Sequence, residues 1–374
     1  MVSLIELVVF TVILATFGYY WKDNIVETFL NQYHLTAPIL ITQNTSQEVK
    51  PVIATYDQND FYNQVALYLS DYIPMELNPN QGGTLQNLAA IEKEKVDLAI
   101  VQEDLYMDAF LGHELFLDKP YKNMRFIAGL YHEVFILITY PESGINSWSD
   151  LKGKVLGFPS QKSGSFQNGF RLAQTVGLIP GKDFKYINVE SMNRLANLFL
   201  ERKLDAIYLT TSNKNPYIIN LAQRMSLKFI GTKEIDYDIL KKYFPNAREK
   251  YINTNNFYTN INTSSFVKSL STRAILVAHS SLDSDYVYKL TRTLYQKVEK
   301  LKLLINSYLY NRDKLNLVLD SFIPIEMSYM DINLKYHPGA EKYYYEFGYI
   351  TNNPNPDCRR YVGQNLFKCP EIQA

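Results

Sequence analysis

The chain has 374 residues, and 38 Lys and Arg are balanced by 38 Asp and Glu, so its formal net charge is zero. This length allows two domains, each with a core of its own. The 47% share of hydrophobic residues is typical of globular proteins and not of disordered ones. No basic stripe interleaved with aromatic residues is present, which argues against a nucleic acid as the partner.

The first 22 residues predict a transmembrane anchor. The stretch from Leu4 to Trp21 is almost entirely apolar. It is just long enough to span the hydrocarbon core of a bilayer, and its Tyr-Tyr-Trp end suits the interface. A cleaved signal peptide needs Lys or Arg before the apolar run and a small-residue cleavage site after it, and neither is present. We therefore expect a single span, with the rest of the chain outside the cytoplasm.

A folded body begins near residue 51, after a stretch at 23–50 that we interpret as a stalk. Strands and helices alternate along this body, which predicts α/β layers around a mostly parallel sheet. The expected strands are 51–55, 97–101, 134–139, 155–158, 185–189, 206–209, 226–230 and 273–278. The expected helices are 61–72, 84–94, one ending near 110, 166–176, 194–202, 216–224 and 286 to about 310.

The alternation occurs twice, with a break near Tyr140. Two crossings of the chain, near Ile138 and Leu276, predict two α/β lobes joined by a hinge. The predicted division is lobe 1 at 51–138 and 277–350, lobe 2 at 139–276, and a C-terminal tail at 351–374. Ligands of open α/β sheets bind beyond the C-terminal ends of the strands.

The loops at those strand ends predict a binding cleft between the lobes. They are 55–60, 81–84, 102–104, 159–165 and 210–215, and they are rich in Ser, Thr, Asn, Gln and Tyr. Such side chains bind through hydrogen bonds. Ser163-Gly164-Ser165 opens a helix directly after a strand, and a helix N-terminus offers N–H groups and a positive dipole end to an anion. The structural alternative is that these serines only cap the helix.

No catalytic constellation has suitable spacing in this sequence. The HExxH, GxSxG and GxxxxGK[ST] motifs are missing, and the five histidines are scattered without metal-ligand spacing. Ser149 to Lys152 fits an SxxK pattern but lacks its companion motifs. We therefore expect a binding protein and not an enzyme, with no metal or cofactor.

Six segments of the body carry a family resemblance through their order and spacing. They are Gly82–Leu88, Val96–Asp104, Ile127–Tyr131, Ser143–Ile145 with Leu151–Lys154, Ser163–Ser165 and Tyr336–Tyr344. In this order they resemble the TAXI family of solute receptors of TRAP (tripartite ATP-independent periplasmic) transporters. The resemblance covers about Val52 to Tyr344, most of the chain.

The resemblance implies a two-lobed, periplasmic-binding-protein-like (type II) fold that closes around a small carboxylate. This would be a glutamate-like compound, a dicarboxylate, or a 2-oxo or 2-hydroxy acid, handed to a TRAP permease in the membrane. The body would then lie in the periplasm, held at the inner membrane by the N-terminal helix. The implied ligand-binding residues are Thr55, Phe61, Tyr62, Gly83, Thr84, Gln102, Tyr131, Ser163, Gly164, Ser165 and Tyr208.

Two features depart from the family pattern. The first loop, Tyr56–Tyr62, keeps two aromatics but lacks glycines, and its Asp57 and Asp60 would repel a nearby carboxylate. An alternative is therefore an envelope interaction or sensory module with an altered or closed cleft. The second departure is the anchor together with the tail, where Cys358 and Cys369 predict one disulfide. A metal pair is less favoured because no His lies near them.

Overall fold

The computed structural model describes residues 50–58, 60–80, 82–212, 215–254, 260–263, 266–307, 335–347 and 350. All of them belong to one compact unit that begins at Lys50. The predicted anchor, the predicted stalk up to residue 49, and the tail with Cys358 and Cys369 lie outside the described residues. Within the described ranges, no helix combines the length and the apolar character needed to cross a membrane.

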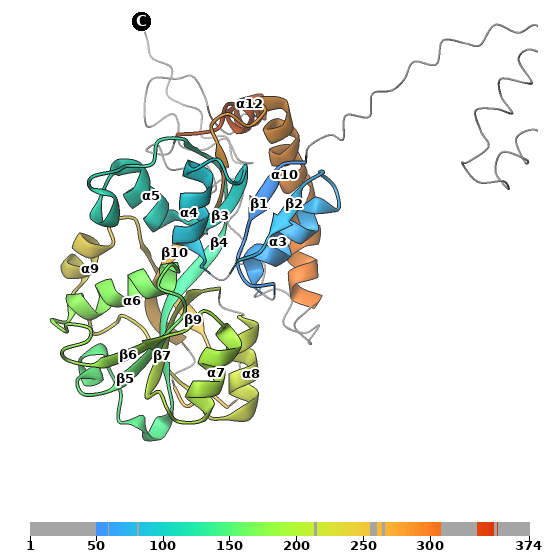
Figure 1. Ribbon diagram of the computed structural model, residues 1–374. Helices are drawn as coiled ribbons and strands as arrows, with labels where there is room; N and C mark the ends of the chain where they lie inside the picture. The colour runs from blue at the N-terminus through green and yellow to red at the C-terminus, as the bar shows by residue number, and fades with distance from the viewer. Residues whose placement is uncertain are drawn as a thin grey trace, which may run out of the picture. The chain divides into compact units, whose positions relative to one another are not determined.

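Strands and helices alternate through this body, as the sequence predicted (Figure 1). The strands are β1 (Val52–Ala54), β2 (Glu76–Asn78), β3 (Leu98–Gln102), β4 (Met124–Thr139), β5 (Val155–Phe158), β6 (Lys185–Asn188), β7 (Ala206–Thr211), β8 (Lys228–Ile230), β9 (Arg248–Asn253) and β10 (Phe266–His279). The helices are α3 (Phe61–Ser70), α4 (Thr84–Glu92), α5 (Glu103–Leu111), α6 (Gly164–Thr175), α7 (Met192–Leu200), α8 (Pro216–Arg224), α9 (Tyr237–Tyr243), α10 (Ser284–Ser307) and α12 (Pro338–Glu346). Short 3-10 turns are η2 (Glu114–Phe116), η3 (Pro141–Ser143) and η4 (Trp148–Leu151).

The strands form one mixed sheet in the order β2-β1-β3-β10-β4-β7-β5-β6, with β8 beside β4 and β9 beside β10. The first three strands are parallel to one another, and so are β5, β6 and β7. In contrast, β4 and β10 run antiparallel to all their neighbours. Parallel strands on each side, joined by two long antiparallel strands, make two α/β lobes. The prediction of a mostly parallel sheet was therefore wrong, because the two crossing strands make the sheet mixed.

The chain crosses between the lobes inside β4 and β10. Strand β4 pairs with β10 as far as Val134, and from Val134 onward it pairs with β7 and β8. Strand β10 pairs with β9 up to Ser271 and with β3 from Ala274 onward. The predicted two-lobed α/β architecture is thus confirmed. The predicted lobe boundaries at 138/139 and 276/277 fall within these two strands and stay a prediction.

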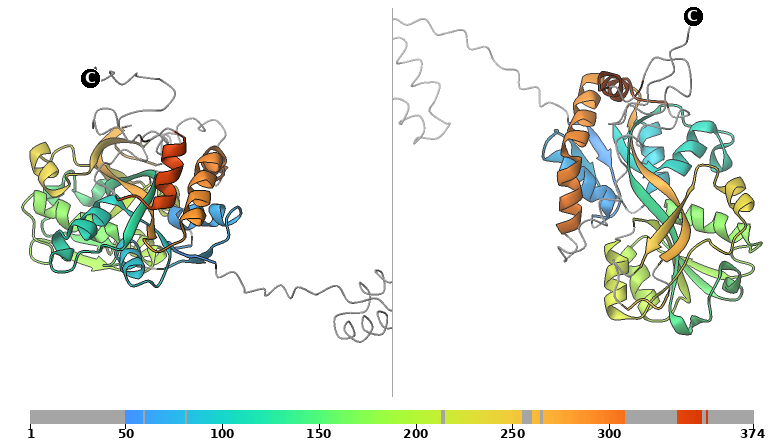
Figure 2. Two further views of the ribbon diagram at one scale, coloured as in Figure 1. Left: turned by 90° about the horizontal axis from the view of Figure 1, so that it is seen from above. Right: turned by 180° about the vertical axis from the view of Figure 1, so that it is seen from behind.

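Each lobe packs helices on both faces of its part of the sheet. In lobe 1, α3, α10 and α12 cover one face, and α4 and α5 cover the other; α10 and α12 lie side by side (Figure 2). In lobe 2, α6 and α9 cover one face, and α7 and α8 cover the other. Val134 and Ile136 pack toward α7 and α8, whereas Phe135 and Leu137 pack toward α6. A strand buried on both faces reads as a continuous apolar run, which is why this segment was recognised.

Several elements differ from the sequence prediction. Strand β4 begins at Met124 instead of Val134, and β10 begins at Phe266 instead of Arg273. The added segments contain polar residues such as Glu133 that interrupt the apolar pattern. The elements β2, β9, α9 and α12 were not predicted as strands or helices.

Candidate functional site

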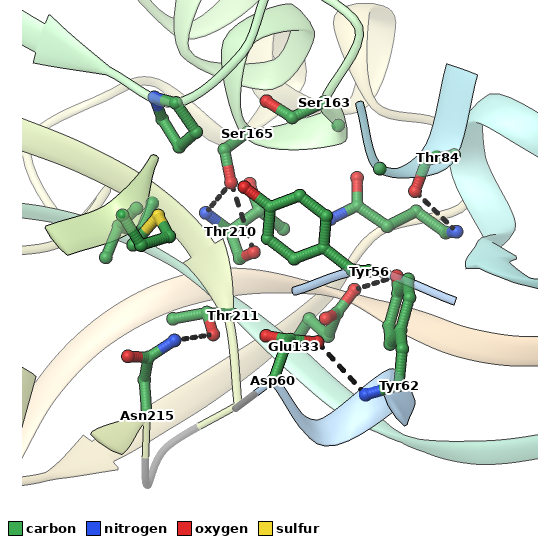
Figure 3. A pocket seen from close by; sticks show the side chains of 16 residues that line it. Tyr56, Asp60, Tyr62, Thr84, Glu133, Ser163, Ser165, Thr210, Thr211 and Asn215 are labelled. Atoms are coloured by element: carbon green, nitrogen blue, oxygen red, sulfur yellow. Dashed lines mark hydrogen bonds between the residues drawn. The ribbon is translucent and has the colours of Figure 1, made fainter. Parts of the chain in front are cut away.

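A pocket lies between the two lobes, where loops at the ends of the parallel strands face each other (Figure 3). Its volume is about 40 Å³, which is room for a few water molecules. The residues that line it are Tyr56, Asp60, Tyr62, Gly83, Thr84, Gln102, Glu133, Pro159, Ser163, Gly164, Ser165, Met192, Leu209, Thr210, Thr211 and Asn215.

The structure brings most of the predicted ligand-binding residues together in this pocket. From lobe 1 these are Tyr62, Gly83, Thr84 and Gln102, and from lobe 2 they are Ser163, Gly164 and Ser165. The two groups are far apart in the sequence, and the ends of the parallel strands bring them face to face.

Three predicted contacts in lobe 1 do not line this pocket. Thr55 is fully buried, and its hydroxyl donates a hydrogen bond to Oδ1 of Asn63 over 3.0 Å. Phe61 and Tyr131 pack against each other, with ring centroids 5.7 Å apart, as part of the lobe 1 core. Their place in the sequence, in a loop or at the junction between the lobes, suggested the cleft. In the structure these side chains pack inside lobe 1 instead.

Tyr208 in lobe 2 also lies away from the pocket. Its ring is fully buried and packs against Trp148 with centroids 5.4 Å apart, and its hydroxyl lies 3.0 Å from Oγ1 of Thr210. The residues that follow it to the end of β7, Leu209 to Thr211, line the pocket instead.

Sequence reasoning missed several lining residues. They are Tyr56, Asp60, Glu133, Pro159, Met192, Leu209, Thr210, Thr211 and Asn215. Most lie in or beside loops that were expected at the cleft, but Glu133 lies inside β4. The available signal was a glutamate directly before the apolar run 134–138, because burying a carboxylate is costly without a partner or a purpose; Arg125 and His132 in the same strand weaken that signal.

The N-terminus of α6 faces the pocket. Of the two serines, Ser163 is the N-cap, and its Oγ accepts the N–H of Phe166 over 3.1 Å. Oγ of Ser165 accepts the N–H of Thr210 over 2.9 Å and donates to the carbonyl of Thr210 over 3.3 Å. Both hydroxyls therefore bond to the protein, so the helix offers a ligand mainly the N–H groups of its first turn and its dipole.

The turn before α4 faces α6 from lobe 1. The N-cap of α4 is Gly83, with φ 70°, and Oγ1 of Thr84 accepts the N–H of Gln102 over 3.2 Å. Oδ1 of Asn80 accepts the N–H groups of Gly82 and Gly83 over 2.9 and 3.0 Å. The left-handed backbone at Gly83 is strained for any residue with a side chain.

The lobes touch each other beside the pocket. The N–H of Leu85 in lobe 1 donates to the carbonyl of Lys162 in lobe 2 over 2.9 Å. Nδ2 of Asn168 donates to Oε1 of Gln102 over 3.3 Å. A Cβ added at Gly164 would lie 1.6 Å from the same Oε1, so a side chain at this position requires the Gln102 amide to move.

Two more contacts connect the lobes. An ion pair joins Arg171 on α6 to Asp108 on α5. The hydroxyl of Tyr217 on α8 donates to Oδ1 of Asp57 over 2.7 Å. Separating the lobes to admit a solute requires that these contacts break.

Comparison with known proteins gives the family. The family model described as NMT1-like matches residues 70–348, which is most of the chain. The chain belongs to the NMT1-like family.

Solved structures that match this NMT1-like protein share little sequence with it. The periplasmic aliphatic sulphonate binding protein SsuA from Escherichia coli is 12% identical, with 74% of this chain and 84% of that chain covered and a TM-score of 0.42. The Candida albicans CA3427 gene product, described as exhibiting the generic periplasmic binding protein fold, is 13% identical, with 73% and 81% covered and a TM-score of 0.46.

The pocket of this NMT1-like protein is acidic. Asp60 and Glu133 line it, and no Lys, Arg or His is among the described residues of its lining. Oδ1 of Asp60 accepts the N–H of Tyr62 over 3.0 Å, and the Tyr62 hydroxyl donates to Oε2 of Glu133 over 3.1 Å. Burial raises the pKa of Asp60 to about 6. Burial, and then the charge of Asp60, raise the pKa of Glu133 well above its ordinary value.

The side chain of Tyr56 fills the middle of the pocket. Its ring lies across the space between the lobes (Figure 3), and a Cβ added at Gly83 would lie 3.6 Å from it. Its hydroxyl is buried and has no hydrogen-bond partner among the described residues. Burial and the charges of Asp60 and Asp57 raise the pKa of this hydroxyl above its ordinary value, so it stays protonated.

Proposed function

We propose that this NMT1-like protein is a solute-binding protein that holds a small polar molecule between its lobes. The observation that carries this proposal is the pocket, which both lobes line with hydrogen-bonding groups and which the N-terminus of α6 faces. A solute that contacts both lobes favours their closed arrangement by its differential affinity. The hydroxyls of Ser163 and Ser165 bond to backbone groups instead of to a general base, which supports binding without catalysis.

We further propose that the solute carries a carboxylate and that the protein delivers it to a TRAP permease, as a TAXI receptor does. The support is the resemblance of Gly82–Leu88, Val96–Asp104 and Ser163–Ser165 to that family, in this order. A carboxylate would bind at the first turn of α6, where the dipole and the N–H groups attract an anion. In this proposal the body works in the periplasm, and residues 1–22 hold it at the inner membrane.

A second candidate is an interaction or sensory module of the cell envelope. The observation that favours it is the pocket volume of about 40 Å³ around the ring of Tyr56, together with the contacts between the lobes. In this case the closed lobes serve as one surface for another envelope protein.

Thermal unfolding of the full chain in detergent tests the two candidates. The panel contains L-glutamate, L-glutamine, L-alanine, 2-oxoglutarate, succinate and L-lactate. A true solute at 100 times its Kd adds about 3 kcal/mol to the free energy of unfolding. The Gly164→Ala variant is the control for the site, because its Cβ displaces the Gln102 amide from its contact between the lobes; its shift with the same compound should be smaller.

No shift with any compound, for a chain that remains folded, contradicts solute binding. Cross-linking in native membranes then tests the second candidate. Recovery of permease subunits alone would contradict that candidate.

A further inference from the structure

The acidic residues of the pocket come from separate elements and converge on one place. Asp60 precedes α3, whereas Glu133 lies on β4 where the chain crosses between the lobes. Figure 3 shows their carboxylates next to each other below the ring of Tyr56. Glu133 is only 5% exposed, so its charge has little contact with solvent.

Neutral groups alone surround this pair of carboxylates within the described lining. Glu133 receives hydrogen bonds from the side chains of Tyr62 and Gln102, and Asp60 receives them from the backbone N–H groups of Phe61 and Tyr62. The negative charge of Asp104 on α5 also acts on Glu133. Buried carboxylates that face each other without a cation are costly to ionise. A cationic ligand removes this cost because it pairs with both.

The Tyr56 hydroxyl is a second, independent sign that a polar ligand belongs here. It is buried, and among the described residues it has no hydrogen-bond partner. Such a group costs free energy unless a ligand or water satisfies it. Figure 3 shows this hydroxyl beside Ser165, at the other end of the ring from Asp60 and Glu133, so the hydroxyl and the two carboxylates lie at opposite sides of the same pocket.

We infer that the solute carries a positively charged nitrogen, an ammonium or amidinium group, which binds between Asp60 and Glu133; this inference rests on the proposed solute-binding function. The carboxylate of the same solute binds at the first turn of α6. The pocket therefore selects zwitterions with zero or positive net charge. It discriminates against dicarboxylates and against 2-oxo or 2-hydroxy acids, because these bring negative charge without the balancing cation.

Isothermal titration calorimetry with matched pairs of compounds tests this specificity on the full chain in detergent at neutral pH. L-Alanine and L-lactate differ by the amino group, L-glutamine and L-glutamate differ by one negative charge, and L-arginine and L-citrulline differ by one positive charge. We expect the first member of each pair to bind more tightly, with at least a tenfold difference for alanine over lactate, as loss of a charge-assisted hydrogen bond implies.

Two neutral variants identify the groups responsible. Glu133→Gln and Asp60→Asn keep the shape of the side chain, and each should weaken binding of the amino compound by about 10- to 100-fold while changing binding of L-lactate little. Asp71→Asn is the matched control, because Asp71 is exposed at the opposite end of α3. Circular dichroism shows whether each variant is folded.

The outcomes separate this inference from the proposed function. Equal or tighter binding of L-lactate or L-glutamate refutes the cation site and leaves solute binding intact. Amino-acid binding that is unchanged in both neutral variants also refutes it. No binding of any compound refutes the proposed function, and the inference falls with it.

Discussion

Replacing Asp60 with asparagine should make the free energy of unfolding less dependent on pH. Asp60 is the N-cap of α3 and accepts the N–H of Tyr62. Asparagine caps a helix about as well as aspartate, so Asp60→Asn removes the charge and keeps the hydrogen bond. The titratable groups around this carboxyl are Asp57 and Tyr56 on the same loop, Tyr62 on α3, and Tyr131 and Glu133 on β4.

The sign of the effect follows from the raised pKa. In the folded chain the pKa of Asp60 is about 6, against an ordinary value of 3.8. Between these values the unfolded chain has already released its proton and the folded chain has not, so stability falls as pH rises. The difference between the two pKa values corresponds to about 3 kcal/mol.

Urea unfolding at several pH values, followed by tryptophan fluorescence, measures this contribution. From about pH 4 to about pH 7, the stability of Asp60→Asn relative to the wild type should increase by about 2–3 kcal/mol. The exposed carboxylate of Asp71 provides the control, and Asp71→Asn should follow the wild type at every pH. A difference between Asp60→Asn and the wild type that is constant with pH would refute the argument, since Asp60 would then ionise alike in both states.

Three further changes have expected outcomes in the same unfolding assay. Tyr56→Phe should raise the free energy of unfolding by about 1 kcal/mol, because it removes a buried hydroxyl without a partner in the described chain; a loss would mean that the hydroxyl is satisfied in solution. Ser165→Ala should cost about 1–3 kcal/mol, since it leaves the backbone of Thr210 without its hydrogen bonds; no loss would show that these bonds are dispensable. Asp108→Asn should cost about 2 kcal/mol and enlarge the radius of gyration in small-angle scattering, because the ion pair of Arg171 holds the lobes together; an unchanged radius would show that other contacts suffice.

Local chemistry made much of the fold predictable. The strand at 155–158 and the helix at 216–224 have the bounds expected from the sequence. Buried strands read as short apolar runs, and Ser163 caps α6 through a bond within three residues of itself. The order of strands and helices then implies two α/β lobes.

The site was less predictable because its decisive contacts are not local. The sequence shows a hydroxyl at Ser165 but not that Thr210 uses it. Both faces of β7 are buried, so the pattern does not tell whether Tyr208 or Leu209 faces the pocket. Glu133 has no neighbour in sequence that marks it as a site residue, and only the packing of α3 against β4 within lobe 1 brings it close to Asp60.

The chain passes between the lobes within two paired strands, β4 and β10, and this limits how the protein can be engineered. Because β4 pairs first with β10 and then with β7, lobe 2 cannot be exchanged as a block without cutting a continuous ladder of backbone hydrogen bonds. Chimeras that replace a whole lobe should therefore misfold more often than chimeras that graft only the loops around the pocket. A biosensor based on this chain is best built by grafting those loops, with fluorophores placed on opposite sides of the crossing strands.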